Sequence, residues 1–420
     1  MKNRLLVLTC LAAAATASVA QSKVEIYGIV DAGVTRVSGL RGGSVTQIAS
    51  GVMEGSRLGF RGQEDLGGGW RTIFLLESRL EVDTGGISNR PPSLNQLPDR
   101  ATFARFLLPS LSGAQQAALQ PVLTRVSAAL GTQIGINVRS DGPAFFDRQA
   151  YVGLITPVGA VLAGRQYTPA FELLSAFDAL SAQSSLALGQ IAVVPYAVEI
   201  RASNALTYRV QHEAFTASLQ VAFGEQSTEV GRSLGALAMV RTDAFGAGVA
   251  YNTRNNENGQ RSLRSAVVGG YVSVGAGRIF ASATAIKDDH PSGVPGIAAQ
   301  ITPLVGPVFA GLIEAAYTEA LTQDAHLFHL GYRHQMNAFT FYTAYNRYDD
   351  HQAVNADVAS FGAACSYALS KRTDVSLVAT RFRNTGLGQA APGGGGYLGG
   401  VTASAGRDST SLALGVRHRF

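Results

Sequence analysis

Alternation of polar and apolar residues with a period of two runs through most of this chain. Residues 57–64 show it clearly, and the turn-forming residues 65–69 separate them from a second alternating run that begins at Trp70. Successive side chains of a β-strand point to opposite faces, so this period predicts strands with one apolar and one polar face. Sixteen such strands are predicted, with the spans 23–37, 56–64, 70–82, 146–155, 160–167, 203–211, 215–224, 233–242, 245–252, 264–274, 278–287, 325–334, 339–347, 356–369, 373–383 and 409–420.

The connections between the predicted strands alternate in length. Short connections include 156–159, 275–277 and 370–372, and long ones include 38–55, 83–145, 168–202, 288–324 and 384–408. Short turns at one rim and long loops at the other are typical of a β-barrel that spans an outer membrane. An even number of strands also brings both termini to the same rim.

The chain is 46% hydrophobic, yet its body contains no run that approaches the roughly 18–20 uninterrupted apolar residues of a membrane helix. A chain that spans a bilayer without helices closes its backbone hydrogen bonds between the strands of a barrel. The sequence therefore predicts an all-β fold, a transmembrane antiparallel 16-stranded β-barrel with long extracellular loops, short periplasmic turns and helical inserts in loops. A large soluble β protein is the alternative that composition alone allows.

Residues 1–20 have the organisation of a signal peptide. Lys2 and Arg4 precede an apolar stretch at 5–19, and small residues at 18–20 favour cleavage before Gln21. An N-terminal membrane anchor is the alternative, but the apolar stretch is short and ends in small residues. The predicted organisation is a signal peptide at 1–20 and a barrel at 21–420, exported through the periplasm. The processed chain would retain one cysteine, Cys365, and could form no internal disulfide.

Two long connections contain helical patterns. Residues 111–130 have helical spacing, and Pro121 is expected to kink or divide that helix. Residues 311–321 predict a second, short helix. The insert at 83–145 is long for a polar loop within one domain, and loops of this length are usually functional or disordered.

Several longer motifs carry a resemblance to a known family. They are VEIYGIVDAGV at 24–34, GSRLGFRGQEDLGGGWRTIFLLES at 55–78, RQAYVGL at 148–154, AGRQYTP at 163–169, SNALTYRV at 203–210, SYALSKRTDV at 366–375 and LGVRHRF at 414–420. With these motifs the chain resembles the Gram-negative trimeric porins of the Neisseria, Burkholderia and Bordetella type. The resemblance implies a homotrimer in the cell outer membrane, surrounded by lipid and lipopolysaccharide, that lets small hydrophilic solutes and ions diffuse passively.

The last predicted strand separates its residues clearly by face. Leu412, Leu414 and Val416 share a face with the terminal Phe420, and Ala413 and its alternate neighbours share the other. The first face suits lipid and the second a wet lumen. In the family a terminal strand that ends in Phe is recognised by the barrel-assembly machinery, so Phe420 is the expected assembly signal. A purely interfacial aromatic is the alternative.

Five arginines are candidates for the narrowest part of the pore. Arg57 and Arg61 have the same parity on one predicted strand, and both are expected to point inward. Arg79 lies on the next strand, and Arg148 and Arg201 match positions at which the family places constriction arginines. Charges at the narrowest section of a channel determine its selectivity. The alternative is a set of solvated charges without a special role.

The resemblance also implies that the third loop, 168–202, folds inward opposite these arginines. Its acids are Glu172, Asp178 and Glu199, and it lacks the Pro-Glu-Phe-Gly-like segment of relatives. With few acids facing several arginines, we expect a weak preference for anions. The second-loop insert, 83–145, is expected to cap the mouth, narrow the channel, bind another partner or extend the contact within a trimer.

Signs of enzymatic chemistry are missing from the sequence. It contains no Gly-x-Ser-x-Gly elbow, no phosphate-binding Gly-Lys-Ser/Thr loop and no His-Glu-x-x-His motif. His326 and His329 are expected on opposite faces of a strand, where they cannot share a metal. We therefore expect no enzymatic activity, no cofactor, no metal and no nucleic-acid partner. The alternatives to a general diffusion channel are a substrate-specific channel, a surface adhesin or structural barrel with a plugged lumen, and an outer-membrane enzyme.

Overall fold

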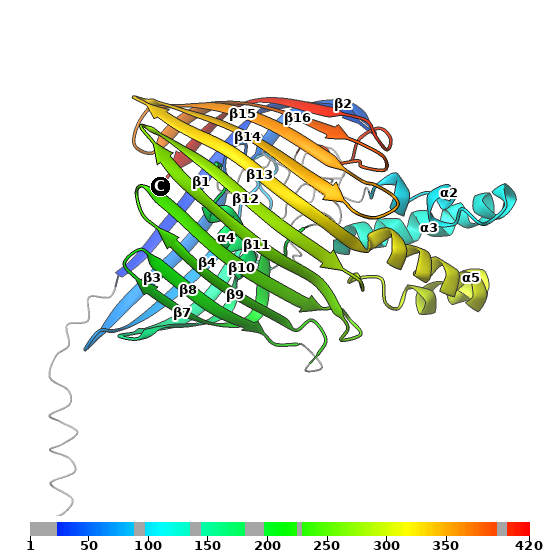
Figure 1. The fold of residues 1–420 in the computed structure, drawn as a ribbon, viewed down its shortest axis with the longest axis horizontal. Helices are drawn as coiled ribbons and strands as arrows, with labels where there is room; N and C mark the ends of the chain where they lie inside the picture. Colours follow the sequence, from blue (N-terminus) through cyan, green and yellow to red (C-terminus); the bar gives the residue numbers. More distant parts are fainter. Residues whose placement is uncertain (1–22, 88–96, 135–143, 181–196, 225–228, 393–400) are drawn as a thin grey trace, which may run out of the picture.

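The computed structural model describes residues 23–87, 97–134, 144–180, 197–224, 229–392 and 401–420, and the predicted signal peptide at 1–20 lies outside them (Figure 1). Sixteen antiparallel strands form the wall of a closed barrel. They are β1 (Lys23–Leu40), β3 (Arg57–Gly67), β4 (Trp70–Arg79), β5 (Gln149–Thr156), β6 (Gly159–Tyr167), β7 (Arg201–His212), β8 (Phe215–Ala222), β9 (Ser233–Arg241), β10 (Phe245–Asn255), β11 (Arg261–Val274), β12 (Gly277–Asp288), β13 (Gln323–Met336), β14 (Phe339–Asp350), β15 (Val358–Ala368), β16 (Thr373–Asn384) and β17 (Ser409–Arg419).

Each wall strand pairs with its neighbours in the sequence, and β17 closes the ring against β1. The predicted 16-stranded barrel is confirmed, since every predicted strand span overlaps one wall strand. At the seam, the backbone N–H of Phe420 donates to Gly28 O and the N–H of Gly28 donates to Phe420 O, both at 3.1 Å. The last residue of the chain is thus part of the closure.

One strand lies where the sequence predicts only a loop. β2 (Gly43–Ser50) follows a tight turn and pairs antiparallel with the second half of β1, whereas β3 pairs with the first half. The pairing between β1 and β3 stops at Ile29, so β2 supplies hydrogen-bond partners for an edge that would otherwise be unpaired. Residues 51–56 connect β2 to β3.

The two faces of the wall differ as the alternation predicts. On β17, Leu412, Leu414 and Val416 are 53%, 56% and 50% exposed, whereas Ala413 is buried. An apolar outer face suits lipid, and a polar inner face suits an aqueous lumen. The assignment of the two faces of the last strand is confirmed.

The third loop begins with a short helix inside the barrel, α4 (Pro169–Ala176; Figure 1). Thr168 caps it by accepting the backbone N–H of Phe171. Phe171, Leu173 and Leu174 are buried against the inner faces of β8 to β11. Apolar side chains on the helix therefore hold the described start of this loop in the lumen, as the resemblance implies.

A group of helices projects beyond the long-loop rim (Figure 1). The 83–145 loop contributes η2 (Asp99–Ala101), α2 (Ala104–Leu107) and α3 (Gly113–Ile134), and the loop between β12 and β13 contributes α5 (Ile297–Leu321). They share one apolar core, in which the hydroxyl of the buried Tyr317 donates to Leu123 O at 3.1 Å. Burial raises the pKa of Tyr317. We call residues 97–134 and 297–321 the loop cap.

The helical expectations are partly confirmed. The predicted helix at 111–130 is α3, and Pro121 lies inside it without dividing it. The predicted helix at 311–321 is only the end of α5, whose earlier part was missed because Pro303, Gly306 and Pro307 suggest a break. Gly306 has φ +78 and joins two helical pieces. Among the described helices, α5 is long and apolar enough to cross a membrane, but its buried residues belong to the loop cap.

Side chains tether the loop cap to distant parts of the rim. A guanidinium nitrogen of Arg41, in the turn between β1 and β2, lies 2.5 Å from Asp99 Oδ1. The backbone N–H of Asp99 donates to the side-chain oxygen of Gln389, which follows β16. A loop that leaves the wall between β4 and β5 thus reaches the ends of β1 and β16, two and four strands away around the ring.

Candidate functional site

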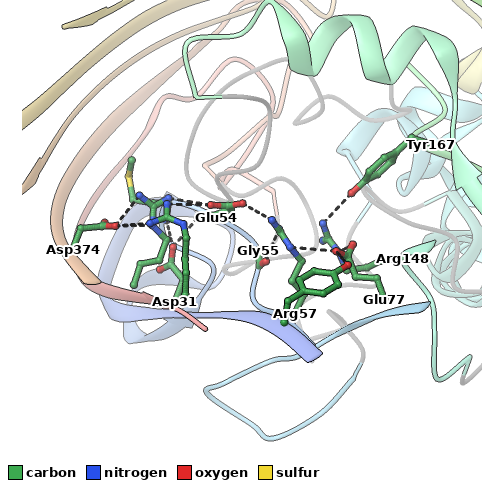
Figure 2. A network of polar contacts seen from close by, with 12 residues as sticks. Asp31, Glu54, Gly55, Arg57, Glu77, Arg148, Tyr167 and Asp374 are labelled. Atoms are coloured by element: carbon green, nitrogen blue, oxygen red, sulfur yellow. Dashed lines mark hydrogen bonds and ion pairs between the residues drawn. The ribbon is translucent and has the colours of Figure 1, made fainter. Parts of the chain in front are cut away.

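Residues 51–56 turn away from the wall because a buried carboxylate holds their backbone. Asp31 on β1 accepts the N–H groups of Val52 at 3.0 Å, Met53 at 2.9 Å and Glu54 at 2.7 Å. Hydrogen bonds to an ionised acceptor are among the strongest in proteins. They place Glu54 at the start of a line of charges (Figure 2).

Acids and arginines alternate along that line (Figure 2). Arg57 lies 2.5 Å from Glu54 and 3.3 Å from Glu77. The second carboxylate oxygen of Glu77 lies 2.7 Å from Arg148, which also donates to the hydroxyl of Tyr167 at 3.0 Å. The 51–56 segment, β3, β4 and Arg148, just before β5, thus contribute to one continuous ion-pair network.

Further ion pairs lie beside this network. On one side Arg417 of β17 lies 3.2 Å from Glu54 and 3.0 Å from Asp374. Nearby, Arg79 lies 3.2 Å from Asp147, which also accepts the backbone N–H of Arg79 at 2.9 Å. We call Arg57, Arg79, Arg148 and Arg417, with the acids that pair with them, the paired wall.

Arg201 lies beside the paired wall but has no carboxylate partner among the described residues. Its guanidinium carbon is 5.0 Å from the centre of the Tyr167 ring, the same tyrosine that Arg148 contacts. The side chain is buried, and in the described part of the chain its Nε and Nη1 atoms lack a hydrogen-bond partner. Unpaired buried donors are costly, so these N–H groups need water or a solute as acceptor.

Four of the five predicted pore arginines come together, namely Arg57, Arg79, Arg148 and Arg201. Arg61 does not join them. It has the inward parity of Arg57, but it lies about 13 Å further along the strand, where its side chain is 58% exposed and pairs with Glu25 at 2.7 Å. Parity predicts the face of a residue and not its height in the barrel.

The acids that face these arginines are mostly not those that the sequence suggested. Of the predicted acids in the third loop, Glu172 pairs with Arg209 at 2.7 Å and Glu199 with Arg254 at 2.8 Å. Asp178 is buried, and its Oδ2 atom has no partner among the described residues. The premise of a sparse acidic side is therefore wrong at the paired wall, whose carboxylates come from the 51–56 segment, β4, β16 and the residue before Arg148: Glu54, Glu77, Asp374 and Asp147.

A second set of arginines lies in a cavity of about 920 Å³ on the inner face near the short-turn rim. Arg241, Arg278 and Arg333 line it from β9, β12 and β13, opposite Glu172 and Asp178 of the third loop. Sequence reasoning missed this set, which we call the arginine row. The sequence does place all three arginines near the ends of predicted strands, with side chains that face inward. It does not show that they lie close together, because that depends on the register between strands.

The described histidines bear on the expectation that they share no metal. Within the ranges that the structure describes, no group of three or more His, Cys, Asp or Glu side chains could hold a metal ion. His326 is exposed and His329 buried, on opposite faces of β13 as predicted. The ring of His329 bonds to Asn346 at 2.7 Å and accepts the N–H of Ala179 at 3.4 Å, so it attaches the third loop to the wall.

Known proteins resemble this chain in sequence and fold. The family model for Gram-negative porins matches residues 7–387. Outer membrane porin protein 32 of Delftia acidovorans is 43% identical over 89 residues, which is 21% of this chain and 25% of the relative. The major outer membrane protein P.IB of Neisseria meningitidis is 39% identical over 87 residues, which is 20% of this chain and 25% of the relative. These matches span about a quarter of each relative.

Solved structures match over most of the chain. The anion-selective porin from Comamonas acidovorans superposes with a TM-score of 0.65 at 21% identity, over 95% of this chain and 100% of that chain. OmpT of Vibrio cholerae, in a trimer form, gives a TM-score of 0.57 at 11% identity, over 95% and 99% of the two chains. At these identities the likeness establishes the barrel fold and nothing finer.

Proposed function

Because the chain belongs to the Gram-negative porin family, we propose that it forms a water-filled channel through which small hydrophilic solutes and ions diffuse passively across the outer membrane. The observation that carries this proposal is a closed sixteen-stranded ring whose outer face is apolar and whose inner face carries charged side chains. A closed ring leaves no backbone group unpaired in lipid. Charges on the inner face need water around them.

The constriction is proposed to lie between α4 and the paired wall. Arg57, Arg79, Arg148 and Arg201 face the lumen from one side, and Glu172 and Asp178 belong to the inward loop. Arg61 is left out because it lies near the short-turn rim. Fixed charges at close quarters select among ions by sign.

A weak preference for anions is part of the proposal. It is supported by Arg201 and the arginine row, which have no carboxylate partner in the described residues, whereas most acids near the third loop are in ion pairs. The preference is weak because the ion pairs of the paired wall cancel much of its charge. The solved Comamonas acidovorans porin with the same fold is called anion-selective.

A homotrimer in lipid and lipopolysaccharide is proposed as the working form. Its support is the family and the trimer form of OmpT from Vibrio cholerae, which shares the fold. Phe420 is proposed as the signal for the barrel-assembly machinery. It is 45% exposed and ends the strand that closes the barrel. Separation of intact trimers by native electrophoresis, with Phe420→Ala as the variant, tests both points.

Of the roles considered for the 83–145 insert, the contacts favour a cap over the mouth. The insert leaves the ring between β4 and β5, yet it packs in one apolar core with α5, which leaves between β12 and β13 on the opposite side of the ring. Deletion of 97–134 should therefore raise the single-channel conductance. An unchanged conductance would show that the loop cap does not lie in the path of the solute.

Liposome swelling tests the channel itself. Liposomes that contain the purified protein should swell in isotonic solutions of small sugars, at rates that fall with the size of the sugar. A plugged adhesin would give no swelling, and an outer-membrane enzyme would release a lipid product without swelling. A substrate-specific channel would pass one solute much faster than others of the same size.

A further inference from the structure

Two arginines of the arginine row stand directly opposite each other on neighbouring strands. The register of β12 and β13 pairs Arg278 with Arg333, and both side chains line the same inner cavity. Directly opposed residues on an antiparallel pair have their Cβ atoms about 5 Å apart, and like charges at such positions are destabilising. Such a pair therefore weakens the sheet unless an anion lies between the two guanidinium groups.

No carboxylate of the described chain compensates the pair. Arg278 donates to neutral oxygens, the hydroxyl of Ser273 at 3.2 Å and the main-chain carbonyl of Asp243 at 3.3 Å. Neither Arg333 nor Arg241 forms an ion pair with any residue in the described ranges. This differs from the paired wall, where each arginine lies next to an acid.

Aromatic rings hold the guanidinium groups in place. The guanidinium carbon of Arg278 is 4.0 Å from the centre of the Tyr271 ring, and that of Arg333 is 5.5 Å from the centre of Phe280. A guanidinium over a ring gains cation–π attraction while its N–H edge stays available for a bidentate contact with an oxyanion.

The register also aligns the third arginine with these rings. Arg241 pairs with Gly246, Gly246 with Tyr271, and Tyr271 with Phe280, so the four positions form one row across β9 to β12. Gly246 leaves room beside Tyr271, because a Cβ there would lie 2.5 Å from a carbon of that ring. Arg241 thus lines the same cavity as the opposed pair.

Four acids also line the cavity, but in the described residues none forms an ion pair with the arginine row. Glu172 pairs with Arg209 at 2.7 Å, and one oxygen of Asp178 accepts the N–H of Leu180 at 2.6 Å. Glu213 and Asp243 lie in the turns at the rim and make no ion pair with the arginine row. With about 920 Å³, the cavity has room for a small organic anion and its water.

We propose that the arginine row is a binding site for a small oxyanion with two negative charges. The site lies on the inner wall near the short-turn rim and deepens the proposed channel function, on which its role in transport rests. Arg278 and Arg333 each engage one carboxylate of a short dicarboxylate, or together engage one phosphate, and Arg241 adds a third positive charge. A passing dianion pauses there, so the flux of dianions saturates and the chloride current falls as the site fills.

Single-channel recording in potassium chloride, with succinate or inorganic phosphate added, tests the site. The wild-type protein should lose chloride current along a saturating curve as the dianion concentration rises. In R278Q/R333Q the half-blocking concentration should rise at least about tenfold, because several charge-assisted hydrogen bonds are lost. Block by succinate alone assigns the site to dicarboxylates, block by phosphate alone assigns it to phosphate, and block by both assigns it to either.

A matched control removes the same charge from another place. Arg347 and Arg381 are exposed on strands far from the cavity, at 50% and 61%, and R347Q/R381Q should keep the wild-type block. A block that does not saturate, or one that is equal in R278Q/R333Q and the wild type, would overturn the site.

Isothermal titration calorimetry separates this proposal from the channel proposal. Detergent-solubilised wild-type protein should bind succinate or phosphate, and R278Q/R333Q should bind at least about tenfold more weakly. If the wild type carried no current but bound the dianion in this way, the channel would fail and the site would stand. Current without any binding or block would reject only the site.

Discussion

The paired wall and the arginine row, both on the inner face of the barrel, differ in whether their arginines have acidic partners. On the paired wall each of four arginines has a carboxylate oxygen within 3.2 Å, and the charges nearly cancel. On the arginine row Arg278 and Arg333 oppose each other without an acid between them in the described residues. The first wall uses charge to hold the 51–56 segment and the strand ends in place. On the arginine row the positive charge is not neutralised by acids, so it is available to attract anionic solutes.

Because of this difference, we expect the paired wall to contribute mainly to the stability of the barrel and the arginine row mainly to ion selectivity. Removing one partner of a buried ion pair leaves a charge without compensation and is strongly destabilising. Removing one of two opposed like charges relieves repulsion. Substitutions on the paired wall should therefore lower stability first, and substitutions on the arginine row should change ion preference while stability is kept or raised.

The largest effect is expected at Glu77, which lies between Arg57 and Arg148. Glu77→Gln should destabilise the barrel by about 3–5 kcal/mol, because two buried guanidinium groups lose their shared counter-charge. Thermal unfolding followed by circular dichroism in detergent measures the change. Glu25→Gln, near the rim, is the control and should have little effect. Equal unfolding temperatures for the two variants would show that the paired wall is not held by its charges.

A smaller loss of stability is expected when Asp31 is substituted, because its carboxylate holds the backbone of residues 51–56. Asp31→Asn keeps the size of the side chain but replaces one acceptor oxygen with a donor, which should cost about 1.5–3 kcal/mol. The freed segment should also change the single-channel conductance. Asp65→Asn, at the exposed end of β3, where the side chain accepts the N–H of Gly67 at 2.8 Å, should change neither quantity. If the conductance of Asp31→Asn stays at the wild-type value, the 51–56 segment does not shape the pore.

Charge reversal within the paired wall sharpens the comparison further. Arg57→Glu places a third carboxylate beside Glu54 and Glu77, so the channel should shift towards cations and also lose stability. R278Q/R333Q should shift towards cations without that loss of stability. Reversal potentials and unfolding curves of the two variants test the separation. If neither variant changed the reversal potential, neither the paired wall nor the arginine row would contribute to ion selectivity.

The smallest effect is expected for an exposed pair on the outer face. Arg381 lies 3.1 Å from Asp408 and is 61% exposed. Arg381→Gln should change stability by no more than about 1 kcal/mol, since exposed ion pairs contribute little. Denaturant unfolding measures it. A loss as large as that of Glu77→Gln would mean that burial does not distinguish the pairs of the two faces.

The barrel could be predicted from the sequence because each wall strand carries its own signal. Alternation such as that of residues 412–416 depends only on which neighbour faces lipid, and it needs no knowledge of distant residues. β2 was missed because its pairing depends on where β3 leaves β1, which local alternation does not show. α5 was shortened for a related reason: the chain does break at Gly306, but the helical piece before the break packs in the same apolar core of the loop cap, which local sequence does not show.

The candidate site was predictable in part. Inward parity and the resemblance pointed to Arg57, Arg79, Arg148 and Arg201. Most of their partners could not be found that way, because Glu77 lies 71 residues from Arg148 and Asp374 lies 43 residues from Arg417. The opposition of Arg278 and Arg333 depends on the register of two strands, and the loop between those strands gives no indication of it.

The reversal potential of the wild-type protein in a potassium chloride gradient, recorded beside that of R278Q/R333Q, tests the account most directly. We expect the wild type to favour chloride weakly and the variant to lose that preference while it unfolds at the wild-type temperature or above. A wild-type channel that favours potassium, or a variant that keeps the preference for chloride, would contradict the assignment of the uncompensated arginines to ion selection.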